Sequence, residues 1–301
     1  MRLGHGRFGI IVVLIWSLLS ACQTAHKPGW DMPSGVKSLW ANGYPIAYVE
    51  RGSGPTVVLV HGALNDYRTW APQMEALASN FRVVAISLRH YYPEPWRGDG
   101  DFSLTLHAQD VAAFIERLGV GPALLVGWSR GGAVVVDTAK MRPDLVRKLV
   151  LMDAAIFNLV QPPAGAPSDD PRITRTKATE VYFRRGDIEG GLRFFFDDIN
   201  GAGAWNKLPE DQRQIRRENA WTIVGQLGDV ENVTCDDMKK FKMPVLLMEG
   251  EQSPTMFKNI RAAIQKCVPG AERAVVPKAA HQMHQANPAG FNAALAKFLS
   301  E

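Results

Sequence analysis

Residues 127–131, which read GWSRG, place a serine between two glycines where two different segments meet. The apolar run 123–126 before them is typical of a buried strand, and the Ala- and Val-rich stretch after them can start a helix. So tight a strand-to-helix turn strains its central residue, and glycine on both sides removes the Cβ atoms that would clash. The turn also exposes the serine hydroxyl for attack on a substrate. The pattern therefore predicts that Ser129 is a nucleophile.

A second short motif, HGAL at 61–64, follows the apolar run 57–60. Its glycine permits a sharp turn, so backbone N–H groups can face the space above Ser129. We expect an oxyanion hole formed by the N–H of Ala63 or Leu64 together with the N–H of Arg130.

Three side chains beside these turns are candidates for the pocket or its frame. Trp128 precedes the nucleophile and either lines the pocket or belongs to the core. His61 is expected at the pocket, where its ring can pin the loop. The side chain of Arg130 braces the loop, meets an anionic substrate or is solvated.

Strands and helices that must position these turns alternate along the chain. Apolar runs predict strands at 36–40, 46–50, 56–60, 81–87, 123–126, 147–152, 244–249 and 274–276. Helical spacing predicts helices at 69–78, 104–118, 130–141, 257–266 and 291–299. This alternation favours the α/β class, with a mostly parallel, doubly wound sheet. We expect residues 36–154 and 241–301 to form its core.

Residues 155–240 interrupt the alternation. They contain no convincing strand, begin with a Pro-rich loop and continue with aromatic and charged helical material. We interpret them as a helical cap, or lid, inserted between two late strands of the sheet. A lid rich in aromatic residues suits an apolar acyl group.

Taken together, a strand ending in His-Gly, the G-x-S-x-G turn, a helical insertion and a late histidine before the last helix resemble the α/β-hydrolase superfamily. The resemblance covers residues 36–301 and is strongest to the esterase, lipase and dehalogenase-like branch with a helical cap. It implies a Ser–acid–His triad with His281 as the general base, because His281 follows small residues and precedes a polar stretch and a proline. His284 is the alternative base. The imidazole would take the serine proton and return it to the leaving group.

The acid of the triad departs from the family pattern. Family members commonly carry an aspartate shortly after the strand that corresponds to residues 245–249, but Ser253 stands there. A hydroxyl cannot stabilise an imidazolium as a carboxylate does. Asp153 is the expected acid, because it ends the strand 147–152 and some members place their acid there. Glu251 is an alternative acid, and a broken triad without catalysis is the third interpretation.

The N-terminal segment resembles an export signal. Arg2 and Arg7 give it a positive start, and an apolar stretch follows that is too short to span a bilayer. Small residues then precede Cys22, as in the bacterial lipobox; an ordinary cleaved signal is the alternative. We expect residues 1–22 to be a lipoprotein-type signal with lipidation at Cys22, and residues 23–35 to be a tether. The protein would be anchored in the bacterial cell envelope, on the periplasmic face of the outer membrane.

Composition narrows the partners and cofactors. The chain has 301 residues and a formal net charge of +4 without a basic cluster, which argues against nucleic acid. No metal-ligand cluster or phosphate loop is visible, so we expect no metal and no cofactor. An oxidising compartment would permit a disulfide between Cys235 and Cys267, with two buried thiols as the alternative. The oligomeric state is not predicted.

These features predict a serine hydrolase, a carboxylesterase in its simplest form. It would cleave a small carboxylester, lactone or thioester through an acyl-enzyme. A cofactor-free perhydrolase or haloperoxidase-like activity uses the same triad and stays open. A non-catalytic ligand-binding protein on a hydrolase scaffold is the alternative of another class. A dehalogenase or epoxide hydrolase is disfavoured, because those relatives use an aspartate nucleophile.

Overall fold

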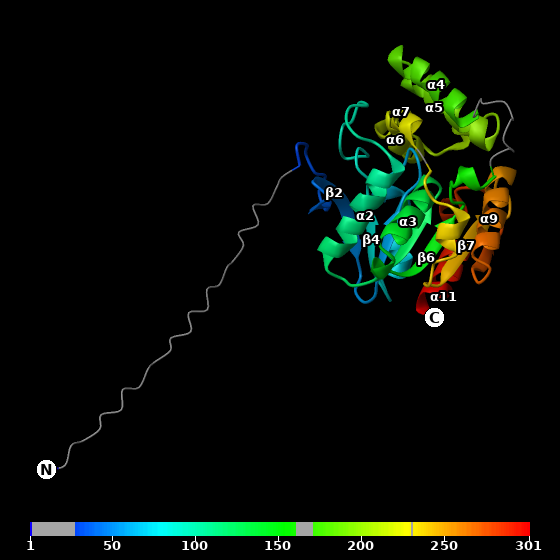
Figure 1. The fold of residues 1–301 in the computed structure, drawn as a ribbon. Coiled ribbons are helices and arrows are strands. Elements are labelled where there is room, and N and C mark those ends of the chain that lie inside the picture. The colour runs from blue at the N-terminus through cyan, green and yellow to red at the C-terminus, as the bar shows by residue number, and fades with distance from the viewer. Residues whose placement is uncertain (2–27, 161–170, 230) are drawn as a thin grey trace.

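An eight-stranded sheet in the order β1-β2-β4-β3-β5-β6-β7-β8 forms the centre of the molecule. The computed structural model describes residues 1, 28–160, 171–229 and 231–301 (Figure 1). The strands are β1 Lys37–Ala41, β2 Tyr44–Arg51, β3 Thr56–Val60, β4 Arg82–Ile86, β5 Ala123–Trp128, β6 Val146–Met152, β7 Val245–Gly250 and β8 Glu272–Val276. The pairs β1–β2 and β2–β4 are antiparallel, and the other pairs are parallel. The predicted α/β class with a mostly parallel sheet is confirmed.

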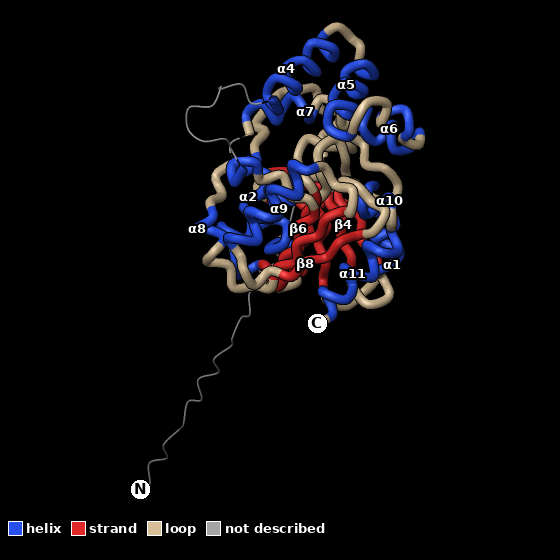
Figure 2. Tube along the Cα trace, turned by 90° about the vertical axis from the view of Figure 1, so that its right-hand side faces the viewer, coloured by secondary structure: helices blue, strands red, loops and turns tan. Residues whose placement is uncertain are grey.

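Helices cover both faces of this sheet, and Figure 2 shows them on its two sides. One face carries α1 Ala71–Leu77, α10 Met283–Ala286 and α11 Pro288–Ser300. The other carries α2 Leu104–Leu118, α3 Arg130–Met141, α8 Cys235–Met238 and α9 Thr255–Cys267. The sheet is therefore doubly wound.

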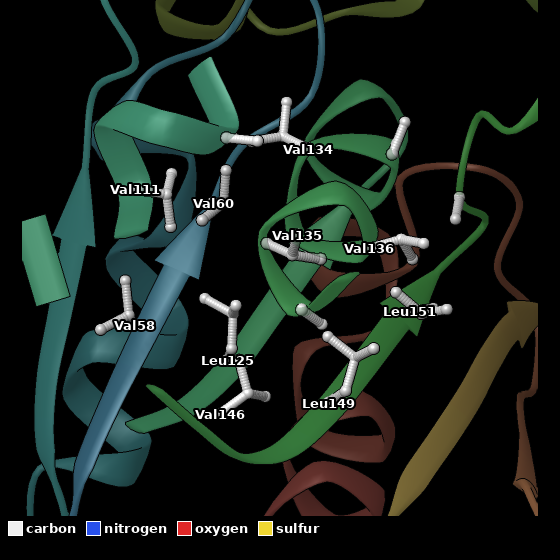
Figure 3. Packing of buried hydrophobic residues seen from close by; sticks show 14 of the residues in the cluster. Val58, Val60, Val111, Leu125, Val134, Val135, Val136, Val146, Leu149 and Leu151 are labelled. Atoms are coloured by element: carbon white, nitrogen blue, oxygen red, sulfur yellow. The ribbon is translucent and has the colours of Figure 1, made fainter. Parts of the chain in front are cut away.

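The central strand β3 shows why the apolar runs are continuous. Successive side chains of a strand point to opposite faces. Val58 and Val60 pack under α2 and α3, where Figure 3 shows them beside Val111 and Val134. Val57 and Leu59 belong to the cluster on the opposite face. Both faces are buried, and each fully buried side chain of this size stabilises the fold by about 1.5–3 kcal/mol.

A helical cap stands over one end of the sheet, at the opposite end of the molecule from the C-terminus (Figures 1 and 2). It consists of α4 Pro171–Arg184, α5 Ile188–Asn200, α6 Glu210–Glu218 and α7 Thr222–Gly225, which lie between β6 and β7 in the chain. Its apolar cluster includes Phe183, Phe195 and Trp205. Leu64 of the core packs into that same cluster, so the cap rests on the predicted oxyanion loop.

The two ends of the predicted insertion belong to the body of the molecule. Helix η3 Phe157–Val160 contacts α9, and α8 contacts both α3 and α9. A disulfide joins Cys235 of α8 to Cys267 of α9, which settles a pairing that the sequence left open. The helices that rise above the sheet therefore span a shorter range than 155–240.

The expected tether is also shorter than residues 23–35. The ring of Trp30 packs on the ring of Tyr44, with centroids 5.7 Å apart, so the folded body begins before residue 36. Cys22 and nearly all of the expected signal segment lie outside the described residues. Within the described ranges, no helix has both the length and the apolar character needed to cross a bilayer.

Candidate active site

Ser129 lies at the sharp turn between β5 and α3, with φ 54° and ψ −121°. The turn needs its glycines: a Cβ on Gly131 would lie 2.3 Å from the His61 carbonyl oxygen, and one on Gly127 2.4 Å from a Val135 methyl carbon. Neighbouring backbone fixes the turn, because the N–H of Ser129 donates to the Met152 carbonyl over 2.9 Å. The serine is therefore held in a conformation that non-glycine residues rarely adopt.

The fold brings the hydroxyl of Ser129, the ring of His281 and the carboxylate of Asp153 into one chain of contacts. Ser129 Oγ lies 3.1 Å from His281 Nε2. His281 Nδ1 lies 3.1 Å from Asp153 Oδ2. A carboxylate only accepts, so the network assigns the ring proton to Nδ1, and the serine hydroxyl donates to Nε2. This is the arrangement that a general base needs in order to activate a hydroxyl.

Two aromatic residues hold the imidazole in place. The ring of Phe257 on α9 stacks on that of His281, with centroids 4.0 Å apart and planes 13° apart. Trp128 Nε1–H donates to the His281 carbonyl over 2.9 Å. Trp128 also lines the pocket, so both of its expected roles occur together. Sequence reasoning missed Phe257, because one apolar residue on an amphipathic helix carries no distinguishing signal.

Ser253 supports the carboxylate of Asp153 directly. Ser253 Oγ–H donates to Asp153 Oδ2 over 2.6 Å, and the Gly250 N–H donates to Ser253 Oγ over 3.0 Å. The Asp153 side chain is fully buried. Glu251, the alternative acid, is exposed and accepts a hydrogen bond from the Lys278 N–H over 2.8 Å. Among the described residues, Asp153 is the carboxylate that contacts His281.

The predicted oxyanion loop approaches the nucleophile closely. A Cβ on Gly62 would lie 3.0 Å from Ser129 Cβ, so a larger residue there would have to push its neighbours aside by a few tenths of an ångström. Ala63, Leu64 and Arg130 border the same cavity as Ser129. In the described part of the chain, the N–H groups of Ala63 and Arg130 donate to no other protein group. They are free to donate to a substrate oxygen.

His61 does not line the pocket, which corrects its expected place. Its ring is fully buried behind the loop. Nε2 accepts a hydrogen bond from the Leu88 N–H over 3.0 Å, and Nδ1 lies 2.8 Å from the Gly62 carbonyl oxygen. Burial lowers the pKa of His61 to about 4, so the ring is neutral at neutral pH. Its side chain pins the loop to the sheet.

The side chain of Arg130 is a buried brace. Its guanidinium makes two hydrogen bonds of 2.8 Å to the carboxylate of Asp229, and a third of 2.8 Å joins it to His107 Nδ1. The network ties the start of α3 to the end of the insertion, so the interpretation of this side chain as solvated is wrong.

A cavity of about 180 Å³ lies between the cap and the body. Ser129 and His281 border it on the body side. Phe195 and Phe196 border it on the cap side, although they also pack the cap's own core. Pockets for drug-sized ligands measure about 300–1,000 Å³, so this one favours a smaller molecule. Within the described ranges, no group of three or more metal-ligating side chains is present.

Comparison with known proteins supports the identification of the fold. Residues 57–294 match the alpha/beta hydrolase family. The chain belongs to this family.

Proteins named as hydrolases are among the relatives of this alpha/beta hydrolase. It is 26% identical to 2-(acetamidomethylene)succinate hydrolase of Mesorhizobium japonicum, over 79% of this chain and 86% of that one. It is 23% identical to an sn-1-specific diacylglycerol lipase of Mus musculus, over 82% and 81% of the two chains. A thermophilic esterase from Thermogutta terrifontis has the same fold, with a TM-score of 0.70 at 21% identity, covering 88% of this chain and 98% of the esterase.

His284 is the second late histidine of this alpha/beta hydrolase, and it lies behind the site. Its ring is fully buried, with Nε2 3.2 Å from Thr69 Oγ1 and the ring centroid 4.6 Å from that of Trp128. Burial is the main reason why its pKa is lowered to about 3; the charges of His281 and Arg216 act in the same direction.

This lowered pKa predicts acid sensitivity of the fold. The unfolded chain, with a histidine pKa near 6.5, binds one more proton than the folded chain between about pH 6.5 and pH 3. The free energy of unfolding therefore falls as the pH is lowered through that window. From pH 7 to pH 5 the loss from His284 is about 2 kcal/mol. His284→Gln, which can keep the bond to Thr69, should lose about 2 kcal/mol less than the wild type in urea unfolding. Equal losses in the two proteins would contradict this.

Proposed function

We propose that this protein is a serine hydrolase that cleaves a small ester-like compound through an acyl-enzyme, as a carboxylesterase does. The observation that carries the proposal is the chain of contacts from Ser129 Oγ through His281 to Asp153 at the edge of the pocket. The names of the relatives, which include an esterase and a lipase, support it. The small cavity favours a carboxylester, lactone or thioester of low mass.

In the first half of the reaction, Ser129 Oγ attacks the substrate carbonyl carbon while His281 Nε2 takes the hydroxyl proton. Asp153 keeps the proton on Nδ1 and stabilises the imidazolium that forms. The carbonyl oxygen becomes an oxyanion, and the N–H groups of Ala63 and Arg130 donate to it. When the tetrahedral intermediate collapses, the bond to the leaving group breaks. The leaving group takes the proton from His281, and an acyl-serine remains.

In the second half, water attacks the acyl-serine with the same groups in the same roles. His281 accepts a proton from the water, and the oxyanion again faces the two N–H groups. Collapse then releases the carboxylic acid and returns the proton to Ser129 Oγ. The cap covers this chemistry with aromatic side chains, which limits competing access of bulk water.

Labelling with a fluorophosphonate probe tests the proposal. The wild type should react stoichiometrically, because an activated serine attacks the phosphorus, and Ser129→Ala should not react at all. Ser53→Ala, at an exposed serine outside the site, is the matched control and should label like the wild type. A folded wild type that takes no label would favour a ligand-binding protein without catalysis.

We also propose that the protein is anchored by lipid on Cys22 in the bacterial cell envelope, at the periplasmic face of the outer membrane. The lipobox-like residues before Cys22 support this location. The disulfide between Cys235 and Cys267 adds support, because such bonds persist in oxidising compartments.

A further inference from the structure

Among the side chains that the structure describes around the pocket, positive and negative charges do not balance. Four arginines line it: Arg130, Arg172, Arg175 and Arg216. Two acidic residues that also line the pocket pair with two of them: Asp229 with Arg130, and Glu231 with Arg172. Arg175 pairs with Asp198, a half-exposed carboxylate that does not line the pocket. Across the described residues, Arg216 forms no salt bridge. The described residues of the pocket wall therefore carry an excess of positive charge.

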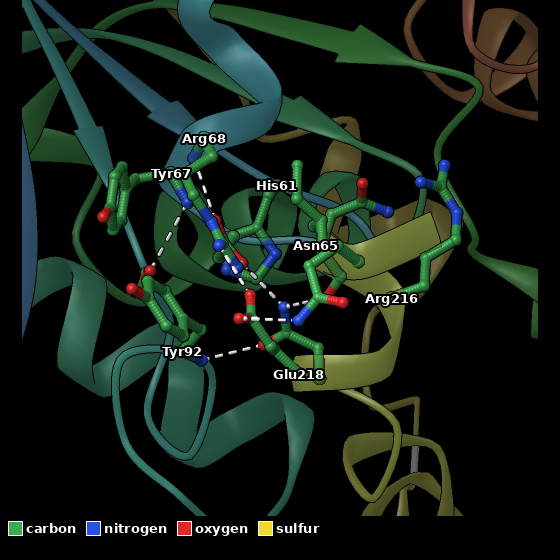
Figure 4. Close-up of polar contacts among 12 residues, drawn as sticks. His61, Asn65, Tyr67, Arg68, Tyr92, Arg216 and Glu218 are labelled. Carbon is green, nitrogen blue, oxygen red and sulfur yellow. Dashed lines mark hydrogen bonds and ion pairs between the residues drawn. The ribbon is translucent and has the colours of Figure 1, made fainter. Parts of the chain in front are cut away.

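Arg216 is the least compensated of these charges. It lies on α6 with 1% of its surface exposed, and its guanidinium carbon lies 5.2 Å from the centre of the Phe196 ring. Figure 4 shows its side chain extending away from Glu218 of the same helix. Burial lowers its pKa to about 10, which leaves it charged at neutral pH. The charges of Asp66 and Asp211 act against this lowering, but neither carboxylate forms a salt bridge with Arg216. A buried charge without a direct ion-pair partner is costly, so a site that keeps one needs a reason for it.

The hydrogen bonds of Arg216 leave part of its donor set unused. Nη1 donates to the carbonyl and side-chain oxygens of Gln212, over 2.6 and 3.1 Å. Nη2 donates to Gln282 Oε1 over 3.0 Å. A guanidinium has five N–H donors, so Nε–H and one hydrogen of Nη2 remain without an acceptor in the described chain. Nε and Nη2 lie on the same edge of the guanidinium, and this edge matches the two oxygens of a carboxylate.

The neighbours of this guanidinium connect it to the reaction. Gln282 directly follows His281, and both residues line the pocket with Ser129. On the same wall, Arg175 Nε is buried and also lacks a hydrogen-bond partner among the described residues. The guanidinium carbon of Arg175 lies 5.0 Å from the centre of the Phe195 ring, and that of Arg216 lies 5.2 Å from the centre of the Phe196 ring. A ligand held here would reach toward the nucleophile from the cap.

We propose that Arg216 binds a carboxylate group of the substrate, so that the ester-like compound cleaved at Ser129 is an anion. Arg175, whose guanidinium lies over the Phe195 ring, adds a second cation to the same wall. This inference rests on the proposed serine hydrolase function and narrows its substrate class. The anion supplies the missing counter-charge, and the planar fork of the guanidinium orients it more firmly than a point charge would.

Paired substrates test the inference. Mono-4-nitrophenyl glutarate and its methyl ester place a carboxylate or a neutral group on the acyl side. 4-Acetoxybenzoate and its methyl ester do the same on the leaving-group side. In the wild type, kcat/KM for the anion should exceed that for the neutral ester in at least one pair. In Arg216→Gln that ratio should fall about 30-fold or more, because a charge partner is lost, and Arg216→Lys should recover part of it.

Arg213→Gln is the matched control, because Arg213 lies on the same helix, pairs with Glu210 and does not line the pocket. In Arg213→Gln, the ratio of kcat/KM for the anionic ester to that for the neutral ester should equal the wild-type ratio. If Arg216→Gln lowers the rates on both members of a pair equally, Arg216 only supports the cap and the inference is wrong. Should neither Arg216 variant fold, wild-type inhibition decides: glutarate should compete with 4-nitrophenyl acetate, and neutral glutaramide should not. Equal inhibition by the two would overturn the inference, whereas hydrolysis of none of the esters would overturn the proposed function itself.

Discussion

Replacing His281 with glutamine is expected to lower kcat on 4-nitrophenyl acetate by about 10⁶-fold. Its Nε2 is the only basic atom in contact with Ser129 Oγ among the described residues, so the variant has no group to take the serine proton. The oxyanion donors and the pocket stay in place, so a small residual rate above that of water should remain. Steady-state kinetics together with fluorophosphonate labelling measure the loss.

The same exchange at His284, three residues further along, is its control. That ring contacts Thr69 and Trp128 but not the serine, so His284→Gln should keep a turnover far above that of His281→Gln. Both variants should give the far-ultraviolet circular dichroism of the wild type at pH 7. If His284→Gln were the dead variant and His281→Gln the active one, the base would be misassigned and the site would have to rearrange on binding substrate.

The nucleophile turn and the sheet could be predicted from the sequence because their determinants are local. Gly127 is required by contacts of its own turn, because a Cβ there would meet a Val135 methyl group and the Gly131 carbonyl oxygen. Apolar runs such as Val57–Val60 reflect burial on both faces of a parallel strand. Neither feature depends on which distant segment packs alongside.

The acidic residue of the triad could not be identified from the sequence, because the ends of two strands could each supply a carboxylate beside His281. β6 and β7 are parallel neighbours in register, with Met152 opposite Met248, and the Asp153 N–H donates to the Met248 carbonyl. The residues that follow both strands therefore reach the same space beside His281. Ser253 in one turn bonds the carboxylate of the other, and this pairing across 100 residues leaves no local pattern.

Contacts between the cap and the body could not be predicted from the sequence either, because they join residues that are far apart in the chain. Arg216 meets Gln282 across 66 residues, and helical periodicity says only that α6 has a polar and an apolar side. The place of the His61 ring, behind the loop rather than at the pocket, is not predictable from its position beside Gly62, which says nothing about where the ring points. Tertiary packing decides such details.

Asp153→Asn is expected to lower kcat by about 10⁴-fold while leaving the turn at Ser129 and the pocket in place. The amide can donate as well as accept, so it no longer fixes the proton on His281 Nδ1, and it carries no charge to stabilise the imidazolium. Ser253 Oγ can still donate to the remaining amide oxygen, so the local packing should persist. Kinetics on a short-chain aryl ester measure the effect, and a melting temperature close to that of the wild type would show that the loss is chemical.

Glu251→Gln makes the same exchange of carboxylate for amide on the neighbouring turn, and it should keep nearly full activity. Glu251 is exposed and bonds the backbone of Lys278, so its charge acts on His281 only through solvent. A large loss in Glu251→Gln with normal turnover in Asp153→Asn would reverse the assignment of the acid. A loss of the same size in both would mean that the two turns move together, and that Ser253 links them mechanically rather than simply supporting one carboxylate.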